Sequence, residues 1–210
     1  MQTITQAIQQ ATRQMRSSSP TQQPSSSKWQ QNAALVRQQF GNEREFKLRA
    51  NPDAQTAFGQ NPTKAVTGNY PTLSHINQAY GNGFAAEWLV AHITDLTIHT
   101  GAKNLNVRQV RQLAEIIATE YRNCKISELM LFFYRFKAGH YGHFYGNTDP
   151  MVVTCALRDF MQERNQIIYA HEQEQRELRE AAHRKANPPI SWEEYCRIKE
   201  INKPNPLTAQ

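Results

Sequence analysis

The stretch SELMLFFYRFKAG, residues 127–139, carries apolar side chains on nearly every side of a helix. A helix that is hydrophobic all round is buried, so this stretch predicts the central helix of a domain. Ser127 is its expected N-cap, and Gly139 is expected to end it. The fold class predicted from this centre is all-α, a compact helical bundle with a long projecting C-terminal helix and a largely disordered N-terminal arm.

Helical periodicity on the N-terminal side of this stretch supports the same class. Apolar residues recur every three or four positions over 73–80 and 84–99, and the turn Gly-Asn-Gly at 81–83 separates these two segments. Asn106 begins another helix, with Gln109 three residues later in the spacing of a capping box. No segment alternates between apolar and polar residues in the manner of a β-strand.

The long C-terminal helix is predicted to start at Asp149 and Pro150, an N-cap followed by proline at the first helical position. Its apolar face continues to Tyr169, beyond which the sequence predicts a solvated single helix. Ser191, Trp192 and the two glutamates that follow predict a short terminal helix with a capping box. The ion pairs expected at i, i+4 spacing are Glu172 with Arg176 and Glu180 with Arg184.

Composition divides the chain into three predicted regions. Residues 1–70 are rich in Gln, Ser, Asn and Pro, which predicts a flexible basic arm with one or two short helices and a loop over 41–70. The helical core domain is expected over 71–170. A solvated helix extension and a short terminal helix are expected over 171–210.

The positive charge of the chain lies mostly in the N-terminal arm. Residues 1–70 carry eight Lys and Arg against three Asp and Glu, within a net charge of +6. A basic arm of this kind suits contact with a polyanion such as DNA. The alternative is that the charge serves only solubility.

The cysteines and the hydropathy indicate a cytoplasmic protein. Cys124, Cys155 and Cys196 are far apart and form no CxxC motif, so neither a disulfide framework nor a cysteine zinc site is expected. The longest fully apolar run, 129–134, is too short to span a bilayer, and we expect no membrane partner. No secretory signal pattern opens the chain.

Enzymatic chemistry is not predicted. His140 and His143, with Asp149, supply too few ligands at a recognisable spacing, so no metal is expected. Cys155 stands beside Ala156 on the predicted core-facing side of its helix, where a thiol is usually inert. Phosphate-binding glycine motifs are absent, and no cofactor is expected.

The remaining candidate site is the glycine-rich stretch KAGHYGHFYG, residues 137–146, which mixes cations with flat rings. This mixture suits phosphate contact and the stacking of unpaired bases. The alternative is that the rings close the open end of the domain, and the two interpretations are compatible. The residues predicted to bind nucleic acid are Arg108, Arg111, Arg135, Lys137, His140, Tyr141, His143, Phe144 and Tyr145.

Three motifs in this part of the chain, SELMLFF, FKAGxYGxFYG and DPxVxxxALRxFxxER, lie within Lys125–Asn165. On these motifs the chain resembles an uncharacterised family, a domain of unknown function, of small helical proteins from phages and mobile elements of gut bacteria. The resemblance covers about Phe84–Asn165. It brings no established activity, and it implies a setting in which replication initiators and helicase loaders are common.

The function expected first is therefore that of a non-enzymatic, DNA-associated accessory protein of a phage or mobile element, in replication as a loader or initiator-like factor. The alternative is a protein-interaction adaptor that acts on a replication or host protein without direct nucleic-acid binding. In that case residues 171–210 would dock the protein partner.

Overall fold

The computed structural model describes residues 26–100, 105–142, 149–188 and 191–201 of the 210-residue chain. Over these ranges the chain is α-helical and contains no β-strand, only one isolated bridge between Thr72 and Lys125. Two compact units are present, Met1–Met161 and Gln162–Gln210. The all-α prediction and the long C-terminal helix are confirmed, whereas the disorder predicted for residues 1–25 lies outside the described residues.

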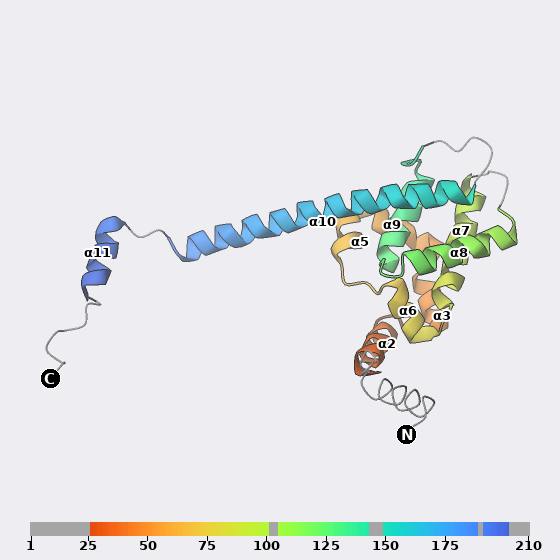
Figure 1. The fold of residues 1–210 in the computed structure, drawn as a ribbon, viewed down its shortest axis with the longest axis horizontal. Helices are drawn as coiled ribbons and strands as arrows, with labels where there is room; N and C mark the ends of the chain where they lie inside the picture. Colours follow the sequence, from red (N-terminus) through yellow and green to blue (C-terminus); the bar gives the residue numbers. More distant parts are fainter. Residues whose placement is uncertain (1–25, 101–104, 143–148, 189–190, 202–210) are drawn as a thin grey trace, which may run out of the picture. The chain divides into compact units, whose positions relative to one another are not determined.

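Helix α9, Ile126–Lys137, is the centre of the first unit (Figure 1), as predicted. All its residues from Ile126 to Phe133 are buried, and so is Phe136. Helices α4 (Gln55–Gln60), α5 (Pro62–Thr67) and α7 (Phe84–Thr100) pack against it. A helix enclosed on several sides needs the apolar surface all round that its sequence shows.

The N-terminus of α9 is attached to the end of α5. The helix begins at Ile126 rather than after Ser127, so the prediction of Ser127 as N-cap is wrong. The buried Ser127 hydroxyl instead donates to the Ala65 carbonyl at 2.6 Å. The Lys125 ammonium donates to the carbonyls of Val66 at 2.7 Å and Gly68 at 2.8 Å. These donors satisfy carbonyls that the end of a helix leaves without partners.

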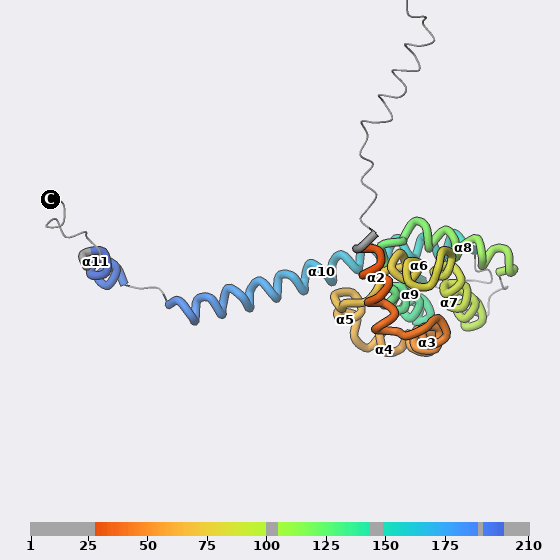
Figure 2. Tube along the Cα trace, turned by 90° about the horizontal axis from the view of Figure 1, so that it is seen from below, coloured from red at the N-terminus to blue at the C-terminus, as the bar shows by residue number. Residues whose placement is uncertain are grey.

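The loop predicted over residues 41–70 is wrong, because this part of the chain is helical (Figure 2). Asn42 caps the next helix in a capping box with Glu45, and the Asn51 side chain accepts from the Ala54 amide before a 3-10 turn. The asparagines and prolines that suggested a loop stand at helix starts, where both residue types are favoured. The helical elements before α6 are α2 (Ser26–Phe40), α3 (Glu43–Arg49), η1 (Pro52–Ala54), α4 and α5.

Phe46 of α3 is the centre of a buried aromatic cluster. Its ring centroid lies 5.1 Å from that of Phe40 and 5.3 Å from that of Tyr80. Phe84 at 5.4 Å and Trp88 at 6.3 Å complete the cluster. The core therefore begins well before Tyr70, where the sequence placed its boundary.

Helix α6, Leu73–Tyr80, has its predicted limits, and helix α8, Val107–Glu120, begins after Asn106 as predicted. Helix α6 packs on α2 and α7, and α8 packs on α7. The capping box at the start of α8 is confirmed, with Asn106 accepting from the Gln109 amide at 2.9 Å and Gln109 accepting from the Asn106 amide at 3.0 Å. Among the described residues, no helix has the length and apolar content needed to cross a lipid bilayer.

Helix α10, Pro150–Ala186, starts at the predicted Asp149-Pro150 signal, with the Asp149 carboxylate accepting from the Met151 amide at 2.9 Å. Its first turns are buried in the first unit, where Phe160 lies 5.7 Å from Phe132 of α9 between ring centroids. From residue 162 onward α10 has no buried residue.

The exposed part of α10 carries a different ion pair from those predicted. Arg176 pairs with Glu180 at 2.9 Å, in place of its predicted partner Glu172. Arg184, the predicted partner of Glu180, donates instead to the Glu180 backbone carbonyl at 3.4 Å. Helix α11, Trp192–Ile201, follows, and Ser191 accepts from the Glu194 amide at its start.

Candidate binding surfaces

Lys137, a predicted phosphate contact, has an ion-pair partner within the fold. Its ammonium lies 2.8 Å from a carboxylate oxygen of Asp95 on α7, and the Lys137 side chain is 19% exposed. The pair joins the C-terminal end of α9 to α7. The Lys137 ammonium is therefore paired with Asp95, and most of the side chain is shielded from solvent.

In the turn after α9, two more of the predicted residues, His140 and Tyr141, differ in their exposure to solvent. Tyr141 is half-buried, and its ring centroid lies 5.7 Å from that of Phe132. His140 is exposed. Gly139 and Gly142 have φ of +79° and +97°, which favour glycine and allow the chain to reverse after α9. The position of Tyr141 agrees with the interpretation that the rings close the end of the domain.

His143, Phe144 and Tyr145 lie outside the described residues. The predicted nucleic-acid contacts at these three positions therefore remain predictions. Among the residues that are described, no group of three or more His, Cys, Asp or Glu side chains is arranged to hold a metal ion.

The predicted arginines fall on two helices. Arg108 and Arg111 are exposed and share one face at the start of α8, because residues three apart are neighbours on a helix. Arg135 is half-buried on α9, and its carbonyl accepts from the His140 amide at 3.1 Å. Arg108 and Arg111 are thus the predicted cations best placed to meet a polyanion.

The prediction that Cys155 faces the core is wrong, because its side chain is exposed. The buried positions of α10 are Val153, Ala156, Leu157 and Phe160, and this helical phase leaves position 155 on the outer side. Cys124 is the buried thiol, 3.2 Å from a carboxylate oxygen of Glu128, and Cys196 is half-exposed.

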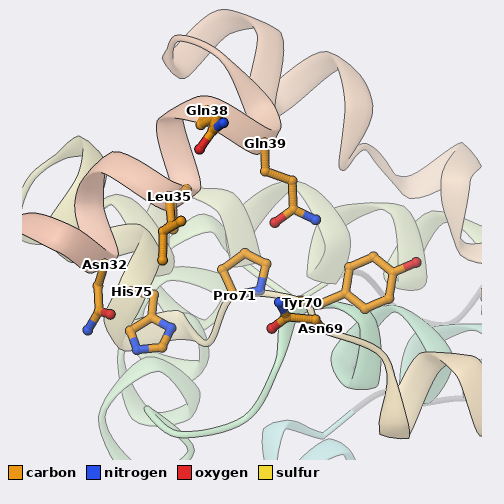
Figure 3. A pocket seen from close by; sticks show the side chains of 9 residues that line it. Asn32, Leu35, Gln38, Gln39, Asn69, Tyr70, Pro71 and His75 are labelled. Carbon is orange, nitrogen blue, oxygen red and sulfur yellow. The ribbon is translucent and has the colours of Figure 1, made fainter.

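A pocket of about 380 Å³ lies between α2, α6 and the segment that precedes α6, and we call it the α2–α6 pocket (Figure 3). Figure 3 shows Asn32 and His75 at one end of it and Asn69 and Tyr70 at the other. Its lining residues are Asn32, Leu35, Val36, Gln38, Gln39, Asn69, Tyr70, Pro71 and His75.

The lining of the α2–α6 pocket mixes carboxamide and apolar side chains and carries no formal charge. Four of the nine side chains are carboxamides, each of which offers both a donor and an acceptor. Burial lowers the pKa of His75 below its ordinary value of 6.5, so this imidazole is neutral at pH 7. The sequence interpretation missed the pocket, because its lining comes from two separate segments that carry no common motif.

The terminal helix α11 exposes large apolar side chains. Trp192 is 75% exposed, Tyr195 42% and Ile198 45%. The Trp192 and Tyr195 rings stack at 5.5 Å between centroids, and the Lys199 ammonium lies 5.9 Å from the Tyr195 centroid. These residues lie within 171–210, the region predicted to dock a protein.

The described fold and surfaces define an all-α protein with an uncharged, amide-lined pocket and an exposed aromatic terminal helix. Residues 104–204 match a family of unknown function, DUF6633. No curated protein and no solved structure matches the chain. The match differs in extent from the resemblance expected over Phe84–Asn165, because it starts at residue 104 and includes most of the region after Tyr169.

Proposed function

We propose that the protein is a non-enzymatic adaptor that docks a protein partner through α11. The observation that carries this proposal is the exposure of Trp192, Tyr195 and Ile198 on one short helix. Tryptophan and tyrosine dominate the binding energy of many protein interfaces when they enter a pocket on the partner. The expected mode is an amphipathic helix lying in an apolar groove of the partner.

The charge of the surrounding region supports a protein partner over a polyanion. Residues 171–210 carry seven Lys and Arg and seven Asp and Glu. A region with no net charge gains little from the release of counterions around DNA. The family match also extends through α11, so the proposed docking helix lies within the matched segment.

Truncation of the α11 rings tests the adaptor proposal. The full chain and its Trp192→Ala, Tyr195→Ala double variant are used to capture proteins from an extract of the native host, and the captured partner is then purified and titrated. We expect the double variant to weaken the partner's affinity at least about tenfold, the size of a hot-spot loss. Leu178→Ala on α10, which removes a side chain that is 58% exposed, is the matched control and should leave the affinity unchanged. Equal affinity of all three proteins would overturn the proposal.

A second candidate function is a DNA-associated accessory role in a phage or mobile element, within replication. It is favoured by the exposed pair Arg108 and Arg111 at the start of α8 and by the excess of Lys and Arg over residues 1–70. Salt-dependent binding to single-stranded or duplex DNA would support it. Both candidate functions belong in the cytoplasm, where the three free cysteines would stay reduced.

A further inference from the structure

We propose that the α2–α6 pocket binds an uncharged, extended peptide, and that its ligand is the chain's own stretch SSSPTQQPS, Ser17–Ser25, which directly precedes α2. This inference goes beyond the adaptor function and does not depend on it. The pocket belongs to the first unit, whereas the adaptor function rests on α11.

The side chains of the pocket select a ligand without charge. A charged ligand would lose its hydration on entry, and no lining residue carries an opposite charge to offset that loss. The carboxamides of Asn32, Gln38, Gln39 and Asn69 can each donate to a carbonyl and accept from an N–H. A peptide backbone presents these two groups at every residue other than proline.

The apolar part of the lining suits proline. Leu35, Val36, Pro71 and the Tyr70 ring offer apolar surface between the amides. The Tyr70 ring packs against Phe58, with the ring centroids 5.3 Å apart in an edge-to-face arrangement. Aromatic grooves of this kind bind extended, proline-containing peptides, whose backbone loses little conformational freedom on binding.

The stretch Ser17–Ser25 has the matching chemistry. It contains only serine, threonine, glutamine and proline, so it carries no charge and is rich in hydrogen-bonding side chains. Pro20 and Pro24 are the residues expected to lie against Tyr70 and Leu35. The rest of the N-terminal region is less suitable, because Arg13 and Arg16 would bring positive charge into an uncharged pocket.

The connection to α2 is long enough for this ligand to reach the pocket. Helix α2 begins at Ser26, and Gln39, the most distant lining residue on α2, is about 20 Å along the helix at about 1.5 Å per residue. The nine residues 17–25 span about 30 Å when extended. A ligand on such a short tether acts at a high effective concentration, so it can occupy the pocket even if its affinity as a free peptide is weak.

An unpaired nucleobase is the competing ligand, because carboxamides also pair with base edges. A nucleotide, however, brings a phosphate with each base, and the nine lining residues include no lysine or arginine. The pocket therefore favours the peptide.

Photo-crosslinking in the full chain tests the inference. Benzoylphenylalanine is placed at position 35, where Leu35 lines the pocket and is 62% exposed. The matched control places it at position 48, where Leu48 is 66% exposed and does not line the α2–α6 pocket. We expect mass spectrometry to find crosslinks to residues 17–25 from position 35, at a yield at least several times that from position 48. Equal yields from the two positions would overturn the inference.

Competition with free ligands and charged substitutions in the peptide test whether the crosslink reports binding in the α2–α6 pocket. Synthetic SSSPTQQPS at millimolar concentration should reduce the crosslink from position 35 several-fold, whereas adenosine or cytidine should not. Gln22→Glu with Gln23→Glu should also reduce it several-fold, while Gln31→Glu, on α2 but outside the lining, should leave it unchanged. Protection by a nucleoside and not by the peptide would reject the inference and assign the pocket to a base. None of these readouts requires the adaptor's partner, so the two proposals fail independently.

Discussion

The imidazole Nδ1 of His92 lies 2.7 Å from the side-chain nitrogen of Gln55, 37 residues earlier in the chain. The Gln55 amide nitrogen is a donor, so Nδ1 accepts, and the Nε2–H of His92 donates to the Ala50 carbonyl at 3.0 Å. The Trp88 indole donates to the same carbonyl at 2.7 Å. His92 also stacks on Phe133 of α9, with ring centroids 5.5 Å apart. A neutral imidazole thus joins the N-terminal helices to the centre of the fold.

The stability of the protein should fall as the pH is lowered from about 6.5 to 4. Burial lowers the pKa of His92 from 6.5 to about 4. Below pH 6.5 the unfolded chain binds a proton at this imidazole, whereas the folded chain does so only near pH 4. The unfolded state is therefore favoured progressively across this window, by about 3 kcal/mol in total. Urea unfolding at a series of pH values measures the effect.

Two variants control for the other titrating groups. His92→Gln should lower stability at pH 7 and should also flatten the pH dependence between 6.5 and 4. His99→Gln, at an exposed position of α7, should leave that dependence as it is. His75, whose pKa is also lowered by burial, contributes in the same direction and accounts for part of the slope left in His92→Gln. A slope unaltered by His92→Gln would contradict the prediction.

Gly59→Ala should destabilise the fold, although alanine is the better helix former by about 1 kcal/mol. Gly59 of α4 lies against the Tyr134 ring of α9, and a Cβ atom at position 59 would clash with that ring. Overpacking of this kind costs about 1–3 kcal/mol. The change in the free energy of unfolding, measured with denaturant, checks the prediction.

A double-mutant cycle shows whether Tyr134 is the cause. In a Tyr134→Ala background, Gly59→Ala should become neutral or stabilising, because the obstructing ring is gone. Gln60→Ala, at an exposed position of the same helix, should have little effect in either background. If Gly59→Ala stabilised the protein with Tyr134 present, this result would contradict the close contact between Gly59 and the Tyr134 ring.

The three thiols should react at different rates in the folded protein. Cys155 is exposed and Cys196 half-exposed, so both should be alkylated rapidly under native conditions. Cys124 is buried beside Glu128, and its reaction should wait for unfolding. Mass spectrometry after timed iodoacetamide labelling measures the three rates. Labelling of Cys124 as fast as Cys155 in the native protein would contradict this order.

If the protein binds DNA, Arg108 and Arg111 should account for more of the salt dependence than Lys137. Each arginine that contacts a phosphate contributes about one to the slope of log affinity against log salt, so Arg108→Ala and Arg111→Ala should each reduce the slope by about one. Lys137→Ala should leave the slope unchanged, because Asp95 already pairs with that ammonium. Arg179→Ala on α10 is the exposed control. A slope reduced only by Lys137→Ala would reverse this assignment.

The features of the fold that the sequence predicted correctly are those with a local signal. The all-round hydrophobicity of residues 127–137, the capping box at Asn106 and the Asp149-Pro150 start each depend on neighbouring residues alone. The helices of residues 41–70 carry start signals, such as the Asn42–Glu45 capping box and the prolines after Asn51 and Asn61, but six or seven residues are too few to display a period of 3.6. The same asparagines and prolines are also typical of loops. The stability of these helices comes from packing against partners distant in sequence, such as Phe46 against Trp88.

The candidate surfaces were predictable only in part for the same reason. The exposed arginines of α8 and the aromatic residues of α11 can be identified from helical periodicity. The partner of Lys137 lies 42 residues away, and the Asn69–Pro71 segment meets α2 about 30 residues after it. Cys155 was placed wrongly because a shift of one position in helical phase moves a side chain by about 100° around the axis.

The hydrogen bonds that join Lys125 and Ser127 to the end of α5 also constrain the order of events during synthesis. The carbonyls of Ala65, Val66 and Gly68 receive these donors from residues 57 to 62 positions later in the chain. The N-terminal helices therefore leave the ribosome before the segment that completes their packing has been made. The first unit reaches its final form only after translation has passed Phe160, which packs on Phe132 of α9. A nascent chain arrested before Ile126 therefore leaves the surfaces of α4, α5 and α7 that contact α9 available to chaperones.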